Sequence, residues 1–133
     1  MFLLLCLCID VQGAPEPLKF MEFSMEQTTQ GYVLSNLGAC VVDLPAPERY
    51  AVHKLIVYGK RPVAARVKAK KDLLQAASLV SYFLKNGQAD MLNAVWQDTI
   101  KRRKGWRLCA LQGRAALLRL ALDLDQDPLK FEG

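Results

Sequence analysis

The sequence predicts an α+β protein, in which a small antiparallel β-sheet in the N-terminal third is followed by a bundle of about four helices. Two β-prone runs lie on either side of a turn-forming tetrapeptide between residues 31 and 44. From residue 47 onward, apolar residues recur at helical spacing. The length of 133 residues is that of one domain. We therefore expect a single domain over 1–133, with strands in 1–44, helices in 47–124 and a tail in 125–133.

The first apolar run, Met1 to Ile9, has two explanations. A covered strand through Leu3 to Val11 would give a continuous run of Leu, Ile, Val and Cys that ends at turn residues. A secretory signal peptide is the alternative, because Gly13 and Ala14 are small residues near a cleavage point, although no Lys or Arg precedes the run. Both explanations stay open, and a secreted basic protein remains the less favoured reading of the whole chain.

Composition favours a cytoplasmic protein without a membrane partner. The first apolar run is about half as long as a membrane-spanning helix. The chain has four cysteines, at uneven spacing, which is not the disulfide framework of a small secreted domain. A reducing compartment is therefore expected.

The next elements follow from local patterns. Leu18 to Phe23 is a short apolar stretch that predicts a strand or a turn of helix under the sheet. Tyr32-Val33-Leu34 and Cys40-Val41-Val42 predict the two strands of a hairpin, with Ser35-Asn36-Leu37-Gly38 as the connection. Pro47 suits the first turn of a helix because proline has no amide hydrogen and a fixed φ.

Four helices are expected after Pro47. The first ends near Tyr58-Gly59, and the second continues from Val67 to a stop at Asn86-Gly87. The third contains Met91 to Ile100 and closes at Lys104-Gly105. The fourth extends from Leu108 to Leu122 and is weakened by Gly113, since glycine is a poor helix former.

Basic residues are concentrated in two blocks. Residues 1–50 carry two cations against six carboxylates, whereas residues 54–71 and 101–119 each carry seven cations and no carboxylate. Fourteen of the 18 basic residues thus lie in these blocks. Such clusters attract the phosphates of nucleotides or nucleic acids. The alternative is that they are solvated helical faces.

The sequence lacks the residues that several classes of chemistry require. His53 is the single histidine and no G-x-S-x-G motif occurs, which disfavours a serine hydrolase. Cys6-Leu7-Cys8 has no second pair, so a zinc site is not expected. Neither a P-loop nor a G-x-G-x-x-G loop is present. The acidic stretch from Asp123 to Asp127 is interpreted as a solvated tail rather than a metal site.

Lys54 and Asp72 carry the most informative pattern. They lie on two predicted helices joined by a basic loop, Lys60-Arg61. In that arrangement Lys54 could bind a triphosphate, and Asp72 could hold the lysine by an ion pair. The alternative is that both are ordinary surface charges.

These motifs carry a family resemblance. The hairpin, the P-x-R-Y-A-x-H-K-L-I-V helix from Pro47, the Lys60-Arg61 loop and the K-K-D-L-x-Q-A helix from Lys70 resemble the C-terminal half of nucleotidyltransferase-like proteins of the DNA polymerase β type, including the abortive-infection (AbiEii-like) toxins. The resemblance covers residues 9 to about 104. It implies that Lys54, with Arg61 and Arg66 as companions, binds nucleotide phosphates and that Asp72 supports the site.

The resemblance also has a gap. In this superfamily a Gly-Ser turn positions the triphosphate and strand carboxylates hold two Mg²⁺ ions. This chain has no Gly-Ser dipeptide, and Gln75 or Ala76 stands where some members have a second acidic residue. The resemblance therefore implies a partial protein that binds an NTP for Mg²⁺-dependent nucleotidyl transfer, with its catalytic half and metal ligands elsewhere, and that is inactive alone.

A non-catalytic module that binds RNA or DNA is the alternative function. Its cations would come from Lys101 to Arg107, in the second basic block, and bases would stack on Trp96, Trp106 and Tyr58. A core position is the competing explanation for both tryptophans.

Overall fold

A computed structural model describes residues 20–120 and residue 129. Helix α1 (Met21–Met25) precedes a two-stranded antiparallel sheet of β1 (Thr28–Ser35) and β2 (Gly38–Pro45). Four longer helices follow, with a single 3-10 turn, Val63–Ala65, between the first two: α2 (Pro47–Lys60), α3 (Arg66–Lys85), α4 (Ala89–Lys101) and α5 (Lys104–Leu120). The predicted α+β class is confirmed. The strand expected in Leu3 to Val11 and the acidic stretch from Asp123 lie outside the described residues.

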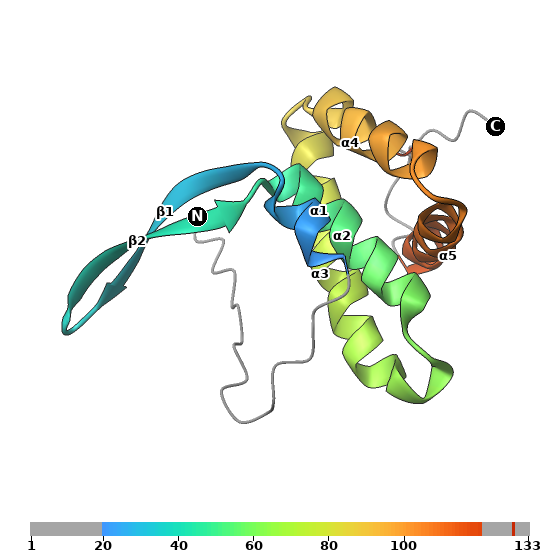
Figure 1. Cartoon of the computed structure of the whole chain (residues 1–133), viewed down its shortest axis with the longest axis horizontal. Coiled ribbons are helices and arrows are strands. Elements are labelled where there is room, and N and C mark those ends of the chain that lie inside the picture. The colour runs from blue at the N-terminus through green and yellow to red at the C-terminus, as the bar shows by residue number, and fades with distance from the viewer. Residues whose placement is uncertain (1–19, 121–128, 130–133) are drawn as a thin grey trace.

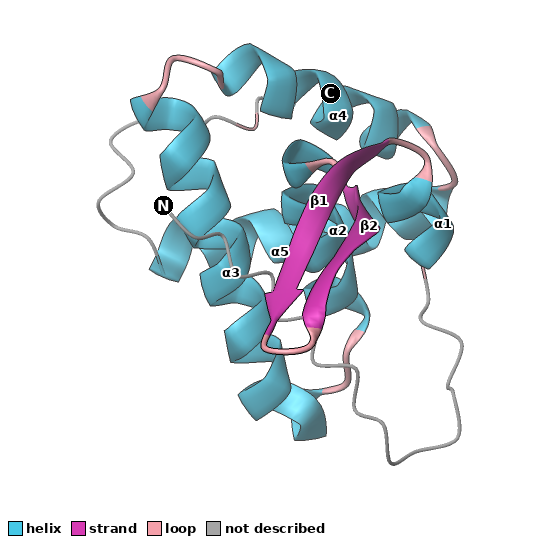
Figure 2. Ribbon diagram, turned by 90° about the vertical axis from the view of Figure 1, so that its left-hand side faces the viewer, coloured by secondary structure: helices cyan, strands magenta, loops and turns pink. Residues whose placement is uncertain are grey.

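The hairpin forms where the sequence predicts it and is longer than expected. Its register pairs Thr28 with Pro45 at the open end and Ser35 with Gly38 at the turn. Gly38 has φ 136°, a conformation that L side chains rarely adopt, so glycine suits this position. The hairpin extends to one side of the helices (Figure 1), and Leu37 at its tip is 95% exposed. In Figure 2 it points toward the viewer, with the helices behind it.

Helix α2 is the centre of the helical body and packs against α1, α3, α4 and α5. Pro47 occupies its first turn, as predicted, and Glu48 adds a carboxylate where the helix dipole favours one. Leu55 and Ile56 of α2 are fully buried, together with Val80 of α3 and Trp96 of α4. The hydrophobic core therefore lies among the helices rather than under the sheet.

The apolar stretch after Leu18 forms helix α1, one of its two predicted conformations, but it packs mainly against α2 and not under the sheet. Phe23 is fully buried in the core, and its ring contacts Trp106 of α5 edge-on at 5.6 Å between centroids. This short helix fixes the base of the hairpin, where the amide of Ala46 donates a hydrogen bond to the carbonyl of Gln27.

Two glycines let α2 and α5 approach each other closely. A Cβ on Gly59 would lie 2.1 Å from the carbonyl oxygen of Cys109, and a Cβ on Gly113 would lie 2.2 Å from that of Leu55. The two contacts are reciprocal and one helical turn apart, so the helices run antiparallel at the crossing. The prediction that this helix ends near Tyr58-Gly59 is confirmed, since α2 ends at Lys60. The interpretation of Gly113 as a weak point of α5 is corrected, because the glycine serves packing.

The junctions between the later helices also differ from expectation in part. Asn86-Gly87 ends α3 as predicted, and Gly87 has φ 66°. Helix α4 ends at Lys101, before the predicted close at Lys104-Gly105, because Arg102 adopts an extended conformation. Helix α5 then begins at Lys104, four residues before Leu108. The basic run at residues 101–104 is therefore a corner between two helices.

Candidate functional site

Asp72 of α3 is the centre of a compact charged cluster, which we call the Asp72 cluster. Asp72 is only 4% exposed. Its Oδ1 accepts a hydrogen bond from Lys54 Nζ at 2.9 Å, and its Oδ2 lies 2.9 Å from Arg61 Nε in an ion pair that lacks hydrogen-bond geometry. The sequence-predicted residues Lys54, Arg61 and Asp72 are thus brought together, and the interpretation of Asp72 as an ordinary surface charge is wrong.

Local structure explains why both cations reach Asp72. Lys54 and Arg61 are seven residues apart, which is two helical turns and places them on the same side of α2. Arg61 is the first residue beyond the helix, and its amide donates to the carbonyls of Val57 and Tyr58. The Lys54 ammonium also lies 5.1 Å from the centre of the Tyr50 ring, a cation–π distance.

The Asp72 cluster carries an excess of positive charge. One buried carboxylate faces two cations, and the side chains of Lys54 and Arg61 are 18% and 30% exposed. An ammonium has three donor hydrogens and a guanidinium five, so donors remain beyond the contacts with Asp72. Charge-assisted hydrogen bonds to phosphate oxygens are the chemistry that such donors support.

Arg66, the other predicted companion, is the first residue of α3, six residues before Asp72. Its side chain lies outside the described part of the structure. The assignment of Arg66 to phosphate binding therefore stays a prediction.

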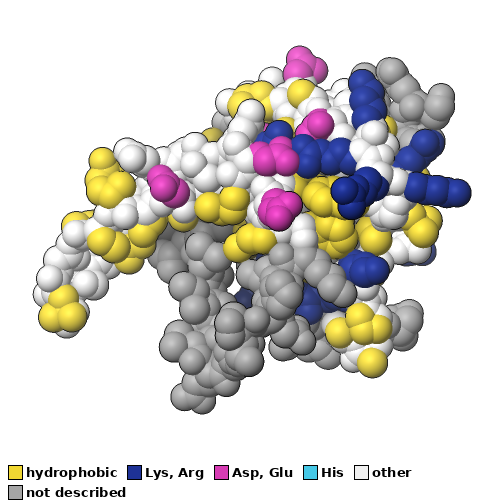
Figure 3. Space-filling view, viewed as in Figure 1, with side chains coloured by type: hydrophobic (Ala, Val, Ile, Leu, Met, Phe, Trp, Pro, Cys, Tyr) yellow, Lys and Arg dark blue, Asp and Glu magenta, His cyan; other side chains and the backbone are white. Residues whose placement is uncertain are grey.

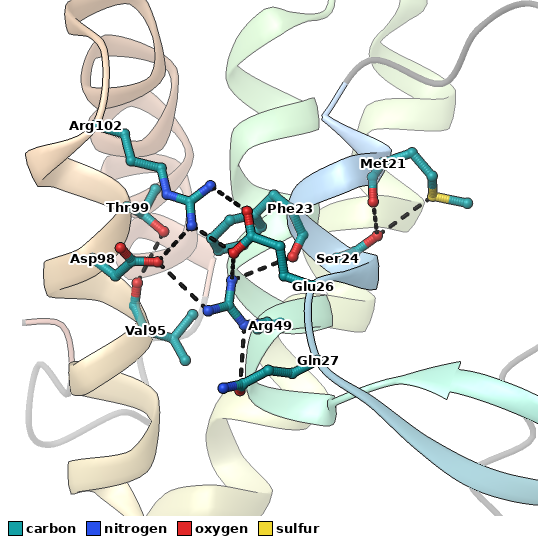
Figure 4. A network of polar contacts seen from close by, with 10 residues as sticks. All are labelled: Met21, Phe23, Ser24, Glu26, Gln27, Arg49, Val95, Asp98, Thr99 and Arg102. Carbon is teal, nitrogen blue, oxygen red and sulfur yellow. Dashed lines mark hydrogen bonds and ion pairs between the residues drawn. The ribbon is translucent and has the colours of Figure 1, made fainter.

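A second polar network joins α1, α2 and the corner after α4 (Figure 4). Glu26 accepts hydrogen bonds from Arg49 at 2.8 Å and from both terminal nitrogens of Arg102, at 2.7 and 2.6 Å. Asp98 accepts from Arg102 at 2.8 Å and lies 3.6 Å from Arg49. Both guanidinium carbons lie 4.9 Å from the centre of the Phe23 ring.

Electrostatics in this network follow from the pairing of two carboxylates with two arginines. Hydrogen bonding from Arg102 is the main reason that the pKa of Glu26 falls below its usual value of 4.5, and Arg49 contributes. The hydrogen bond to Glu26 likewise raises the pKa of Arg102, which stays charged. We assign the network a structural role, because it ties α1 and the corner at Arg102 to the centre of the bundle.

Sequence reasoning did not find this network. Arg49 belongs to the quoted helix motif but received no role, and Glu26 was counted only as one of the N-terminal acids. Glu26 and Arg102 are 76 residues apart in the sequence, so no local pattern could pair them. The i,i+4 spacing of Asp98 and Arg102 was the one local indication.

The aromatic residues expected to stack with bases are placed differently. Trp96 is fully buried in the core, so its predicted stacking role is wrong. Trp106 packs edge-on against Phe20, with 4.8 Å between ring centroids, and Tyr58 is half-buried against the core. The competing explanation, core packing, holds for Trp96.

The described residues do not fit a metal centre. Within 20–120 and 129, no three His, Cys, Asp or Glu side chains gather as metal ligands would. Asp72, the most buried carboxylate of the candidate site, already faces two cations. Nor does any helix in that part of the chain have both the length and the apolar character needed to cross a bilayer.

Comparison with known proteins identifies the family. No curated protein and no protein of known structure matches the chain. A family model described as Nucleotidyltransferase matches residues 10–101. The match contains the hairpin, the Asp72 cluster and all of α4. It spans well over half of the sequence, and the chain therefore belongs to the nucleotidyltransferase family.

Proposed function

We propose that the Asp72 cluster binds the phosphates of a nucleoside triphosphate for Mg²⁺-dependent nucleotidyl transfer. The observation that carries the proposal is the pairing of one buried carboxylate with two partly exposed cations, Lys54 and Arg61. Membership of the nucleotidyltransferase family supports a nucleotide as the ligand.

Asp72 acts in this proposal as a positioning residue. A lysine side chain loses considerable rotamer entropy when it is fixed. Because the ion pair already holds Lys54 in place, less of this entropy is lost when a ligand binds. Arg61 is restrained in the same way from the opposite carboxylate oxygen. The two cations then present their other donors to phosphate oxygens, and Arg66 at the start of α3 adds a third positive charge.

Mg²⁺ and its carboxylate ligands come, in this proposal, from a catalytic half outside the described residues. The ion would neutralise charge that develops on the transferred phosphoryl group. The sequence has no Gly-Ser dipeptide to position a triphosphate. We therefore expect this chain alone to bind a nucleotide without transferring it.

Nucleotide binding to the purified chain tests the proposal. Isothermal titration calorimetry with ATP and GTP, each with and without Mg²⁺, would compare the wild type with Lys54→Ala and the matched control Lys85→Ala. Lys85 is exposed in the last turn of α3 and belongs to neither polar network. Loss of one charge-assisted contact of about 1.5–3 kcal/mol predicts a Kd increase of roughly 10- to 100-fold for Lys54→Ala alone.

Two results would contradict the proposal. One is an unchanged Kd in Lys54→Ala, and the other is no binding of either nucleotide with Mg²⁺ to the folded wild type. A thermal melt of each variant separates loss of the fold from loss of the ligand, because Arg61 remains beside Asp72 when Lys54 is removed. If only the melting temperature changes, the Asp72 cluster is purely structural.

A further inference from the structure

The corner between α4 and α5 is the most concentrated exposed charge in the described part of the chain. Lys101, Arg103 and Lys104 lie within four consecutive residues, and all three side chains are exposed. We call these three residues the basic corner. In the space-filling view, Lys and Arg gather on the side where α5 lies in Figure 1 (Figure 3).

Among the described residues, the two carboxylates that bind the middle of this corner are already balanced. Glu26 and Asp98 both bind Arg102, and both also face Arg49, so two acids balance two arginines. Helix α5 has no acidic residue from Lys104 to Leu120. Within the described residues, therefore, neither α5 nor these two carboxylates supply an acid that balances Lys101, Arg103 and Lys104.

The position of these charges is costly for the helix itself. The N-terminus of a helix carries a partial positive charge, so acidic residues usually occupy the first turn and cations there are unfavourable. Helix α5 has none of the usual acids in its first turn and begins with Lys104. An anionic partner at the basic corner would offset this repulsion.

The basic corner is also held in a fixed shape. Arg102, in the middle of it, is clamped by Glu26 and Asp98, and its guanidinium carbon lies 5.5 Å from the centre of the Trp106 ring. Its backbone is extended, which separates the two helices. The surrounding cations thus project from a rigid turn, so less conformational entropy is lost when they bind.

The antiparallel crossing of α2 and α5 joins the two basic blocks of the sequence. Because Gly59 packs on Cys109, the C-terminal end of α2 lies beside the first half of α5. The exposed Lys60 follows Gly59 at that end, so a cation of the first block lies on the helix next to α5. Cations spread over neighbouring helices fit a linear polyanion better than a single small anion.

We propose that the basic corner binds the phosphate backbone of a nucleic acid, without reading its sequence. The corner provides cations on a rigid turn. Trp96 is buried and cannot stack with bases. Binding of this kind is driven by counterion release, depends steeply on salt and requires no Mg²⁺. It is independent of the proposed nucleotide site, since it uses none of the Asp72 cluster.

Fluorescence anisotropy with labelled 20-nucleotide oligo(U) RNA and oligo(dT) DNA, in EDTA from 50 to 300 mM NaCl, tests the proposal on the full chain. The decisive variant is Lys101→Gln/Arg103→Gln/Lys104→Gln. Loss of three phosphate contacts should make the negative slope of log K against log salt less steep by about 2. This corresponds to binding on the order of 10²-fold weaker at the lowest salt. The two oligomers distinguish RNA from DNA.

The matched control removes the same charge from another helix. Lys70, Lys71 and Lys85 are exposed on α3, and Lys70→Gln/Lys71→Gln/Lys85→Gln should leave the slope nearly unchanged. Equal losses in both variants would overturn the proposal, because net charge alone would then explain binding. No binding of either oligomer at 50 mM NaCl would also overturn it, as would binding only to vesicles that contain phosphatidylserine.

Discussion

Replacing Gly113 by alanine is expected to destabilise the protein, although the same change stabilises most exposed helices. The new Cβ would lie 2.2 Å from the carbonyl oxygen of Leu55, and 2.7 and 2.8 Å from its carbonyl carbon and Cα. These are backbone atoms of α2, so no rotamer change can relieve the contact. The helices must instead separate along their crossing.

The size of the effect follows from the cost of overpacking, less the gain in helix propensity. Restoring normal contact requires α5 to move by about 1 Å, and a gap of that size loses a quarter to a half of the dispersion attraction at each contact. Overpacking of a core typically costs about 1–3 kcal/mol, and a backbone clash belongs at the upper end. Alanine regains about 1 kcal/mol of helix propensity. The net loss in unfolding free energy is therefore about 2 kcal/mol.

Urea denaturation followed by circular dichroism measures this change, and Gly105→Ala is its control. Gly105 lies in the same helix, and a Cβ there would meet no atom within 4 Å. Gly105→Ala should stabilise the fold by up to about 1 kcal/mol. If Gly113→Ala were as stable as Gly105→Ala, the close crossing of α2 and α5 would be refuted.

Three further changes test other parts of the structure. Lys54→Met and Arg61→Met should each lose about 1 kcal/mol of unfolding free energy, whereas the double variant, which leaves Asp72 buried without a cation, should lose about 3–5 kcal/mol in the same denaturation assay. Because the folded-state pKa of Glu26 is lowered, its contribution to stability is complete above its usual value of 4.5 and is lost as the pH falls toward the folded-state pKa. Glu26→Gln should therefore reduce the fall in melting temperature on acidification. Leu37→Ser, at the exposed tip of the hairpin, should change stability by less than about 0.5 kcal/mol.

Each of these expectations has a clear contrary result. Additive losses in the Lys54 and Arg61 variants would show that Asp72 does not depend on both cations. An unchanged acid dependence in Glu26→Gln would remove Glu26 from the network with Arg102. A large loss in Leu37→Ser would place the hairpin tip against other parts of the chain.

The elements that the sequence predicts well are those with strong local determinants. Pro47 begins α2 because its fixed φ and missing amide hydrogen suit the first turn of a helix. The hairpin turn forms between β-prone runs, and Gly38 supplies its positive φ. These preferences act within a few residues, so tertiary packing did not change them.

Tertiary packing determines what the sequence did not predict. Glycine in a helix costs free energy locally, which is why Gly113 was interpreted as a weak point. Its value lies in the close approach of α2, which no pattern within α5 reveals. Trp96 likewise was compatible with an exposed face or a core position, and only the arrangement of α4 against α2 decides for the core.

The candidate site was predicted in composition but only partly in geometry. A lysine and an aspartate on neighbouring antiparallel helices are natural ion-pair partners, and the contact between Lys54 and Asp72 follows that expectation. That Arg61 binds the opposite carboxylate oxygen depends on how α2 ends. Long-range partners such as Glu26 and Arg102 depend on the fold as a whole.

The hairpin has a consequence for the cooperativity of the protein. Most of its side chains are exposed, and it extends away from the helices (Figure 1). A two-stranded ribbon in water has little stability of its own. Its strands should therefore open and close many times for each unfolding of the helices, so amide hydrogens of β1 and β2 should exchange with solvent deuterium well before those of α2. We therefore expect the hairpin to unfold locally while the helices stay folded.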